Sequence, residues 1–106
     1  MFANTPKPPY YAVIFTSTRT DIDAGYGEVA QGMVGLAGAR PGFLGVESAG
    51  GEDGLGITVS YWQGEAAGLA WKQHAEHTDA RNAGRAQWYR QCITRVAHVQ
   101  RAYAFE

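Results

Sequence analysis

The stretch FLGVESAGGEDGLGITVSYW, residues 43–62, decides the fold. Two short runs, 43–49 and 55–62, are rich in β-branched and aromatic residues, which favour strands. They flank the glycine-rich loop GGEDG, whose length is typical of a β-hairpin. The stretch therefore predicts two adjacent antiparallel strands. The segments on either side of it must supply the other strands and the helices of the fold.

Before this hairpin, the sequence predicts a strand and then a helix. YYAVIFTSTR, residues 10–19, contains no Gly or Pro and is aromatic and β-branched, as expected of a long strand. In the segment that follows, Asp23 is a plausible N-cap, and Val29, Met33 and Leu36 are spaced as one face of a helix.

After the hairpin, residues 63–91 have the alanine and charge content of a helix, with an interruption near Gly84. CITRVAHVQRAYAFE, residues 92–106, is predicted to be the last strand. The order is β-α-β-β-α-β, which predicts a ferredoxin-like α+β fold: a four-stranded antiparallel sheet with both helices on one face.

The predicted strands do not alternate cleanly between apolar and polar residues. Residues 10–15 form one unbroken apolar run, whereas a sheet face in water should give alternation. The face away from the helices must therefore be covered, and a chain of this length has no spare element to do so. We expect a second copy to pack sheet against sheet, giving a homodimer.

Length and composition limit the classes of function. The 106 residues suit one domain, predicted over 10–106 after a short leader, residues 1–9, which lacks the pattern of a signal peptide. A net charge of −1 argues against nucleic acid as a partner. No stretch is apolar enough to cross a membrane, and the single Cys92 fits a cytoplasmic location.

Three stretches carry a family resemblance: PGFLGVES (41–48), ITVSYW followed by EAAGLAWKQH (57–74), and GRAQWYRQCITRVAHVQRAYAF (84–105). With the order of elements, they resemble the antibiotic biosynthesis monooxygenase-like family of dimeric α/β barrels. The resemblance implies a pocket in each subunit between helices and sheet, with Trp71 on its wall. It also implies cofactor-independent oxidation of a small phenol or quinol, with no metal or cofactor.

The candidate site residues gather between positions 71 and 89. His74 lies three residues beyond Trp71, so on a helix it projects near the same side and is the candidate general base, with Trp71 the stacking wall. His77, Trp88 and Tyr89 are candidate substrate contacts. The HxxH pair lacks the further ligand of a zinc site, so no metal is expected.

Two alternatives remain open. The same pocket suits a non-catalytic module that binds a small aromatic or apolar ligand, and it also suits haem binding or degradation. Haem-degrading members of the family use an asparagine on the first strand, where this chain has Thr16, Ser17 and Thr18. They also use a histidine about ten residues beyond the helix tryptophan, where this chain has Arg81.

The orientation of the second helix is also open. Leu69 and Trp71 lie nearly opposite one another at 100° per residue, so only one of them can face the sheet squarely. A pocket between helix and sheet would let Trp71 turn inward.

Overall fold

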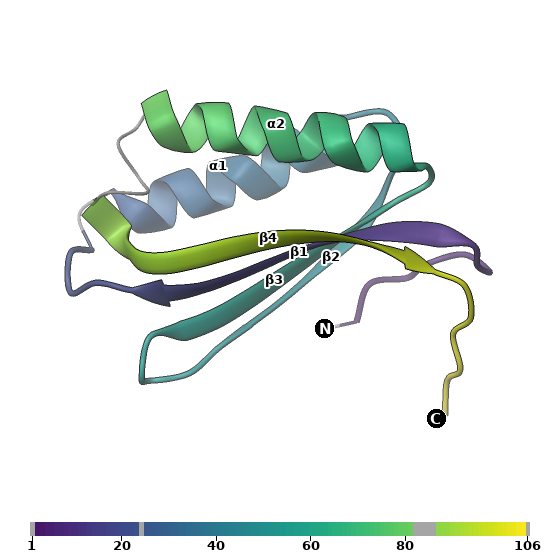
Figure 1. Ribbon diagram of the computed structural model, residues 1–106, viewed down its shortest axis with the longest axis horizontal. Coiled ribbons are helices and arrows are strands. Elements are labelled where there is room, and N and C mark those ends of the chain that lie inside the picture. Colours follow the sequence, from purple (N-terminus) through teal and green to yellow (C-terminus); the bar gives the residue numbers. More distant parts are fainter. Residues whose placement is uncertain (1, 24, 82–86, 106) are drawn as a thin grey trace.

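The computed structural model describes residues 2–23, 25–81 and 87–105, with the backbone alone for residues 79–81. Its elements are β1 (Tyr10–Arg19), α1 (Tyr26–Gly38), β2 (Phe43–Gly50), β3 (Leu55–Trp62), α2 (Glu65–Arg81) and β4 (Tyr89–Val99). The strands form one antiparallel sheet in the order β2-β3-β1-β4. Both helices lie on one face (Figure 1). The predicted ferredoxin-like α+β fold is confirmed.

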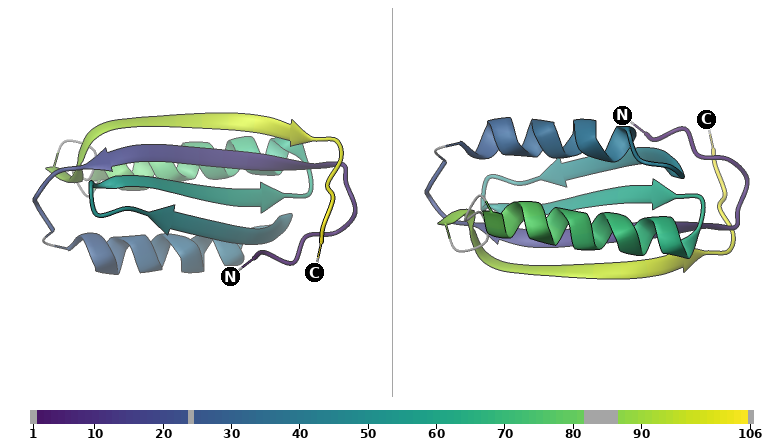
Figure 2. Two further views of the ribbon diagram at one scale, coloured as in Figure 1. Left: turned by 90° about the horizontal axis from the view of Figure 1, so that it is seen from below. Right: turned by 90° about the horizontal axis from the view of Figure 1, so that it is seen from above.

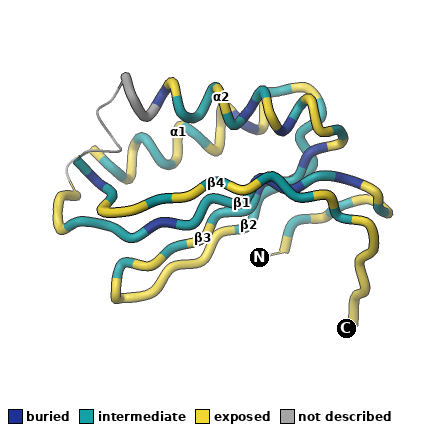
Figure 3. Tube along the Cα trace, in the orientation of Figure 1, coloured by how far each residue is buried: buried dark blue, intermediate teal, exposed yellow. Residues whose placement is uncertain are grey.

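The register of the strands sets which residues face the helices. Val13 of β1 lies opposite Ser60 of β3 and Val96 of β4. Residues opposite one another in adjacent strands point to the same face, so this set lies on the helix side. The core cluster is there and consists of Val13, Ala37, Trp62 and Trp71. Figure 3 shows buried positions, in dark blue, on β1 and on α2.

Two details of the first helix differ from the prediction. The N-cap is Gly25, at φ 78°, and it makes no side-chain cap hydrogen bond. Asp23 lies two residues before this cap position, and its carboxylate pairs with Arg19 at 3.1 Å. On the inner face the buried residue is Ala37, whereas Leu36 is 44% exposed. Met33 packs against the core cluster as predicted, and only the last position of the predicted face differs, because Ala37 is buried in place of Leu36.

The last strand is displaced relative to the predicted range 92–106. It begins at Tyr89, which lies opposite Arg19 beyond a β-bulge, and it ends at Val99, which lies opposite Tyr10. Residues 100–105 lie beyond the start of β1 and are not paired with any strand. The predicted helix over 63–91 ends at Arg81 in the structure. The interruption predicted near Gly84 lies outside the described residues.

The sheet face opposite the helices, called here the open face, is covered in part by the chain itself. Ala3 donates its backbone N–H to Glu47 at 2.9 Å, and Thr5 forms a hydrogen bond with the hydroxyl of Tyr10 at 3.2 Å. The N-terminal segment, residues 2–9, thus packs on one end of this face (Figure 2, left). The expectation that the chain has no element to spare is wrong for this end of the sheet.

The rest of the open face stays exposed and apolar. Leu55, Ile57 and Ile93 are 45%, 42% and 47% exposed. The C-terminal tail beyond β4 carries Tyr103 and Phe105 at 89% and 98% exposure. Neither described helix is long and apolar enough to span a bilayer.

Candidate functional site

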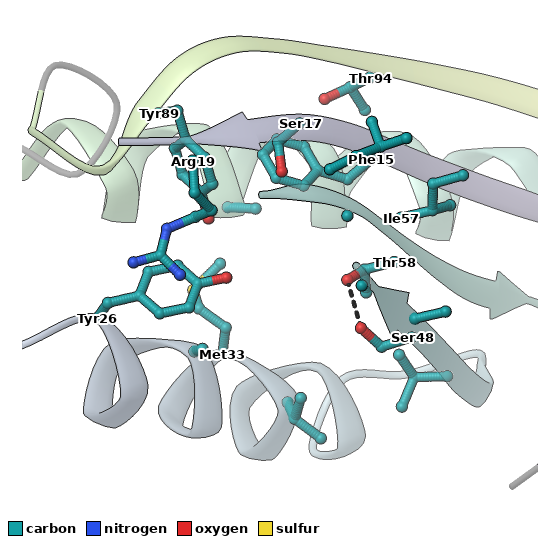
Figure 4. A pocket seen from close by; sticks show the side chains of 18 of the residues that line it. Phe15, Ser17, Arg19, Tyr26, Met33, Ser48, Ile57, Thr58, Tyr89 and Thr94 are labelled. Atoms are coloured by element: carbon teal, nitrogen blue, oxygen red, sulfur yellow. Dashed lines mark hydrogen bonds between the residues drawn. The ribbon is translucent and has the colours of Figure 1, made fainter. Parts of the chain in front are cut away.

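A cavity of about 690 Å³ lies between the sheet and the two helices. Figure 4 shows its side chains converging from β1, α1 and the hairpin. Its volume is in the range that holds a small organic ligand. Its wall includes Phe15, Ser17, Arg19, Tyr26, Trp71 and Tyr89.

One part of the wall belongs to a stack of aromatic rings. Trp71 stacks on Trp62 with ring centroids 5.8 Å apart, and Trp62 is completely buried. The indole N–H of Trp62 donates to the Ser60 hydroxyl at 2.8 Å. Gly68 lets α2 approach this stack, since a Cβ at that position would lie only 3.3 Å from Val13. Trp71 is 8% exposed, and it is held rigidly where a ligand would meet it.

A second group of rings surrounds Tyr26 in the first turn of α1. The guanidinium of Arg19 lies 3.3 Å from the centre of the Tyr26 ring. Trp88 and Tyr89 meet Tyr26 edge to face, at 5.7 and 6.1 Å. Tyr89 also contacts Phe15 at 5.3 Å. These contacts fix Tyr26 at the cavity wall.

Arg19 is anchored on several sides. Its Nε donates to the carbonyl of Trp88 at 3.3 Å, and Nη2 donates to the carbonyl of Ile22 at 3.3 Å and to Asp23 at 3.1 Å. The Arg19 side chain is 22% exposed, whereas that of Asp23 is 86% exposed. The guanidinium of Arg19 is thus fixed beside the cavity, whereas the carboxylate of Asp23 that pairs with it is exposed to solvent.

The structure separates the predicted site residues into two groups. Trp71 and Tyr89 line the cavity. His74 is half-buried and leans against the Trp71 ring at 5.8 Å, but it is not part of the cavity wall. His77 is exposed and Trp88 is buried behind Tyr26, and neither belongs to the wall.

Two further expectations concern α2. Trp71 turns inward while Leu69 is 42% exposed, which settles the orientation of the helix. The side chain of Arg81 lies outside the described part of the structure. Among the described residues, no group of three or more His, Cys, Asp and Glu side chains could hold a metal ion.

Sequence reasoning missed Phe15, Ser17, Arg19 and Tyr26. The first three share one parity of β1 with Val13, and Val13 faces the helices. Side chains alternate along a strand, so this parity was a signal that could have placed them on the cavity side. No comparable sequence signal placed Tyr26 at the cavity, because its position on the wall depends on a tertiary contact with Arg19.

Comparison with known proteins gives one relative in sequence and several in structure. No family model matches the chain. YqjZ of Bacillus subtilis (strain 168), described as uncharacterized, is 52% identical over 104 residues, covering 98% of this chain and 91% of YqjZ.

The structural likeness extends to enzymes. SnoaB, a cofactor-independent oxygenase from Streptomyces nogalater, superposes with a TM-score of 0.71 at 12% identity, covering 90% of this chain and 97% of SnoaB. A candidate antibiotic biosynthesis monooxygenase from Chloroflexus aurantiacus gives 0.51 at 17% identity, covering 83% and 92%. At these identities the likeness is one of fold. The chain therefore belongs to the same family as YqjZ, and it has the fold of the antibiotic biosynthesis monooxygenase-like proteins.

Proposed function

We propose that this chain is a cofactor-independent monooxygenase that oxidises a small phenol or quinol. The observation that carries the proposal is the cavity of about 690 Å³ between helices and sheet, with aromatic rings from β1, α1, α2 and β4 on its wall. Planar rings suit a planar ligand, because stacking and edge contacts orient it. SnoaB, which has the same fold, is a cofactor-independent oxygenase.

The reaction balances without a further reductant. A phenol with a hydrogen on the ring and one O₂ give a quinone and one water, so the substrate supplies all four electrons that reduce dioxygen. Ionising the phenol raises its electron density and makes it the reductant. The chain then has to bind the ring, hold its oxygen and exclude water from the reacting carbon.

His74 has a different part in this proposal from the predicted one. Its ring contacts Trp71 at 5.8 Å and does not line the cavity. We therefore propose that His74 positions Trp71, rather than taking a proton from the substrate directly. The variant His74→Gln should keep the pH profile of turnover, whereas loss of the acidic limb, the fall in rate as the pH drops, would restore the role of general base.

The test is oxygen uptake by the purified protein with a panel of naphthols and hydroquinones. With isotopically heavy dioxygen, a monooxygenase places one labelled atom in the product and the other in water. Phe15→Trp enlarges a ring on the cavity wall and should lower uptake by crowding the ligand, while Leu69→Trp, on the exposed side of α2, is the matched control. Absence of uptake above the protein-free rate across the panel would refute the proposal.

A second candidate is a non-catalytic module that binds a small aromatic ligand. It is favoured by one observation: no histidine is among the described residues that line the cavity. A binding module should gain thermal stability from the phenols without consuming oxygen. Heat-induced unfolding and oxygen uptake measured on the same samples separate the two candidates.

We further propose that the exposed part of the open face packs on a second copy. Leu55, Ile57 and Ile93 leave an apolar strip there at 42–47% exposure, which is unfavourable in water. Light scattering coupled to size-exclusion chromatography should give twice the mass of one chain, and Ile93→Asp should give one. An unchanged mass for Ile93→Asp would rule out this face as the interface.

A further inference from the structure

Two hydroxyl groups point into the cavity with no partner in the described structure. Figure 4 shows the Tyr26 hydroxyl directed inward from α1 and the Ser17 hydroxyl directed inward from β1. Within the described residues, neither forms a hydrogen bond. Ser17 is 7% exposed, so a hydrogen bond from its hydroxyl to a ligand would be largely shielded from solvent.

Arg19 places a positive charge beside the Tyr26 hydroxyl. Its guanidinium lies 3.3 Å from the ring centre. A cation held at this position favours negative charge on a ligand nearby.

The described part of the cavity wall has five acidic residues. Asp21, Asp23 and Glu52 are exposed. Of the two half-buried ones, Glu76 pairs with Lys72. The other, Glu47, accepts hydrogen bonds from the Ala3 N–H and the Tyr61 hydroxyl. Solvent screens the charge of the three exposed groups more strongly than that of half-buried Arg19.

We propose that Tyr26 and Ser17 bind the oxygen of the ligand and that the positive charge of Arg19, held against the Tyr26 ring, selects its ionised form, so that a phenol binds as its phenolate. The choice of a phenol rests on the proposed function. In this step the phenol O–H bond breaks, the electron pair stays on oxygen and the proton passes to water or buffer. The cavity therefore needs no histidine to prepare an oxygen-reactive substrate.

The test is an equilibrium titration under nitrogen with para-nitrophenol, whose phenolate absorbs visible light. The wild-type protein should bind the phenolate more tightly than the phenol, so the pKa of the bound ligand should fall below that of the free ligand. Tyr26→Phe should weaken phenolate binding by roughly ten- to hundredfold, the usual effect of losing a hydrogen bond to a charged group. Ser17→Ala should act in the same direction.

Controls separate this role from loss of fold. Tyr11→Phe removes a hydroxyl from a tyrosine that stacks on His98 at 4.8 Å, outside the cavity wall, and should bind phenolate as the wild type does. Asp23→Asn removes the exposed counter-charge of Arg19 and should tighten phenolate binding by roughly two- to fivefold. The para-nitroanisole ether cannot ionise, so its binding should not respond to Asp23→Asn.

The outcomes distinguish this inference from the proposed function. Preference for the neutral phenol, equal effects of Tyr26→Phe and Tyr11→Phe, or no binding by the wild type would each overturn the inference. Oxygen uptake is a separate readout. If phenolate binds as expected and no oxygen is consumed, the inference stands and the oxygenase proposal fails.

Discussion

A methyl group on Gly45 would collide with the N-terminal segment. A Cβ at this position in β2 would lie 2.7 Å from the Cβ of Ala3. Two carbon atoms pack best at about 3.5–4.0 Å, so Ala3 would have to move by about 1 Å. The Ala3 N–H donates to Glu47 at 2.9 Å, and a shift of that size takes it beyond hydrogen-bond range.

The cost of Gly45→Ala follows from this bond. A hydrogen bond to a charged acceptor contributes about 1.5–3 kcal/mol, and partial exposure reduces that value. Replacing Gly by Ala also lowers the conformational entropy of the unfolded chain, which offsets about 0.5 kcal/mol of this loss. We therefore expect the free energy of unfolding to fall by about 1–2 kcal/mol, or Tm by roughly 4–8 °C.

Urea unfolding followed by tryptophan fluorescence tests this prediction in two backgrounds, the full chain and a chain lacking residues 2–9. In the shorter chain nothing remains for the methyl group to meet, so Gly45→Ala should be neutral or stabilising. Gly32→Ala is the matched control: no atom lies within 4 Å of its added Cβ, and it should stabilise both backgrounds by about 0.5–1 kcal/mol. An equal loss from Gly45→Ala in both backgrounds would refute the docking of the segment.

Three further predictions concern buried polar and aromatic groups. Ser60→Ala should lower the free energy of unfolding by about 1–3 kcal/mol in urea titrations, because the buried Trp62 N–H loses its acceptor. Trp71→Ala should cost about 3–5 kcal/mol in the same assay, since it empties part of the core cluster. The pKa of Glu47 is lowered by the hydroxyl of Tyr61 and the Ala3 N–H, so its contribution is present above a glutamate's ordinary value of about 4.3 and is lost as pH falls through the lower folded value. Stability measured from neutral to acid pH should therefore drop, and Glu47→Gln should flatten that drop.

The sequence allowed the fold to be predicted because its strand signals are local. The hairpin loop and the β-branched runs placed β2 and β3 almost to the residue, and YYAVIFTSTR matches β1 fully. The ends of β4 were missed because a strand extends only as far as its partner. Val99 pairs with Tyr10, the first residue of β1. Nothing in the residues after Val99 themselves reveals that limit.

The site was less predictable than the fold. Trp71 was predicted because the family resemblance placed it on the pocket wall. It turns inward because Gly68, which has no side chain, lets α2 pack closely against Val13 and Trp62 of the sheet. Helical spacing alone put His74 on the same side. Three residues correspond to about 300°, so the two side chains diverge enough for His74 to contact Trp71 and still miss the cavity. Arg19 and Tyr26 meet through tertiary structure, which spacing does not encode.

The arrangement of the cavity wall gives a ligand a direction. Trp62, the ring on which Trp71 stacks, lies opposite Tyr11 near the start of β1, whereas Arg19 is the last residue of that strand. Stacking surface is thus provided toward one end, and a held cation with the free hydroxyl of Tyr26 toward the other. A ligand that satisfies both must be flat along its length and carry its ionisable oxygen at one terminus. A phenol with its oxygen in the middle of a fused ring system would satisfy only one end, so affinity should depend on the position of that oxygen more than on the number of rings.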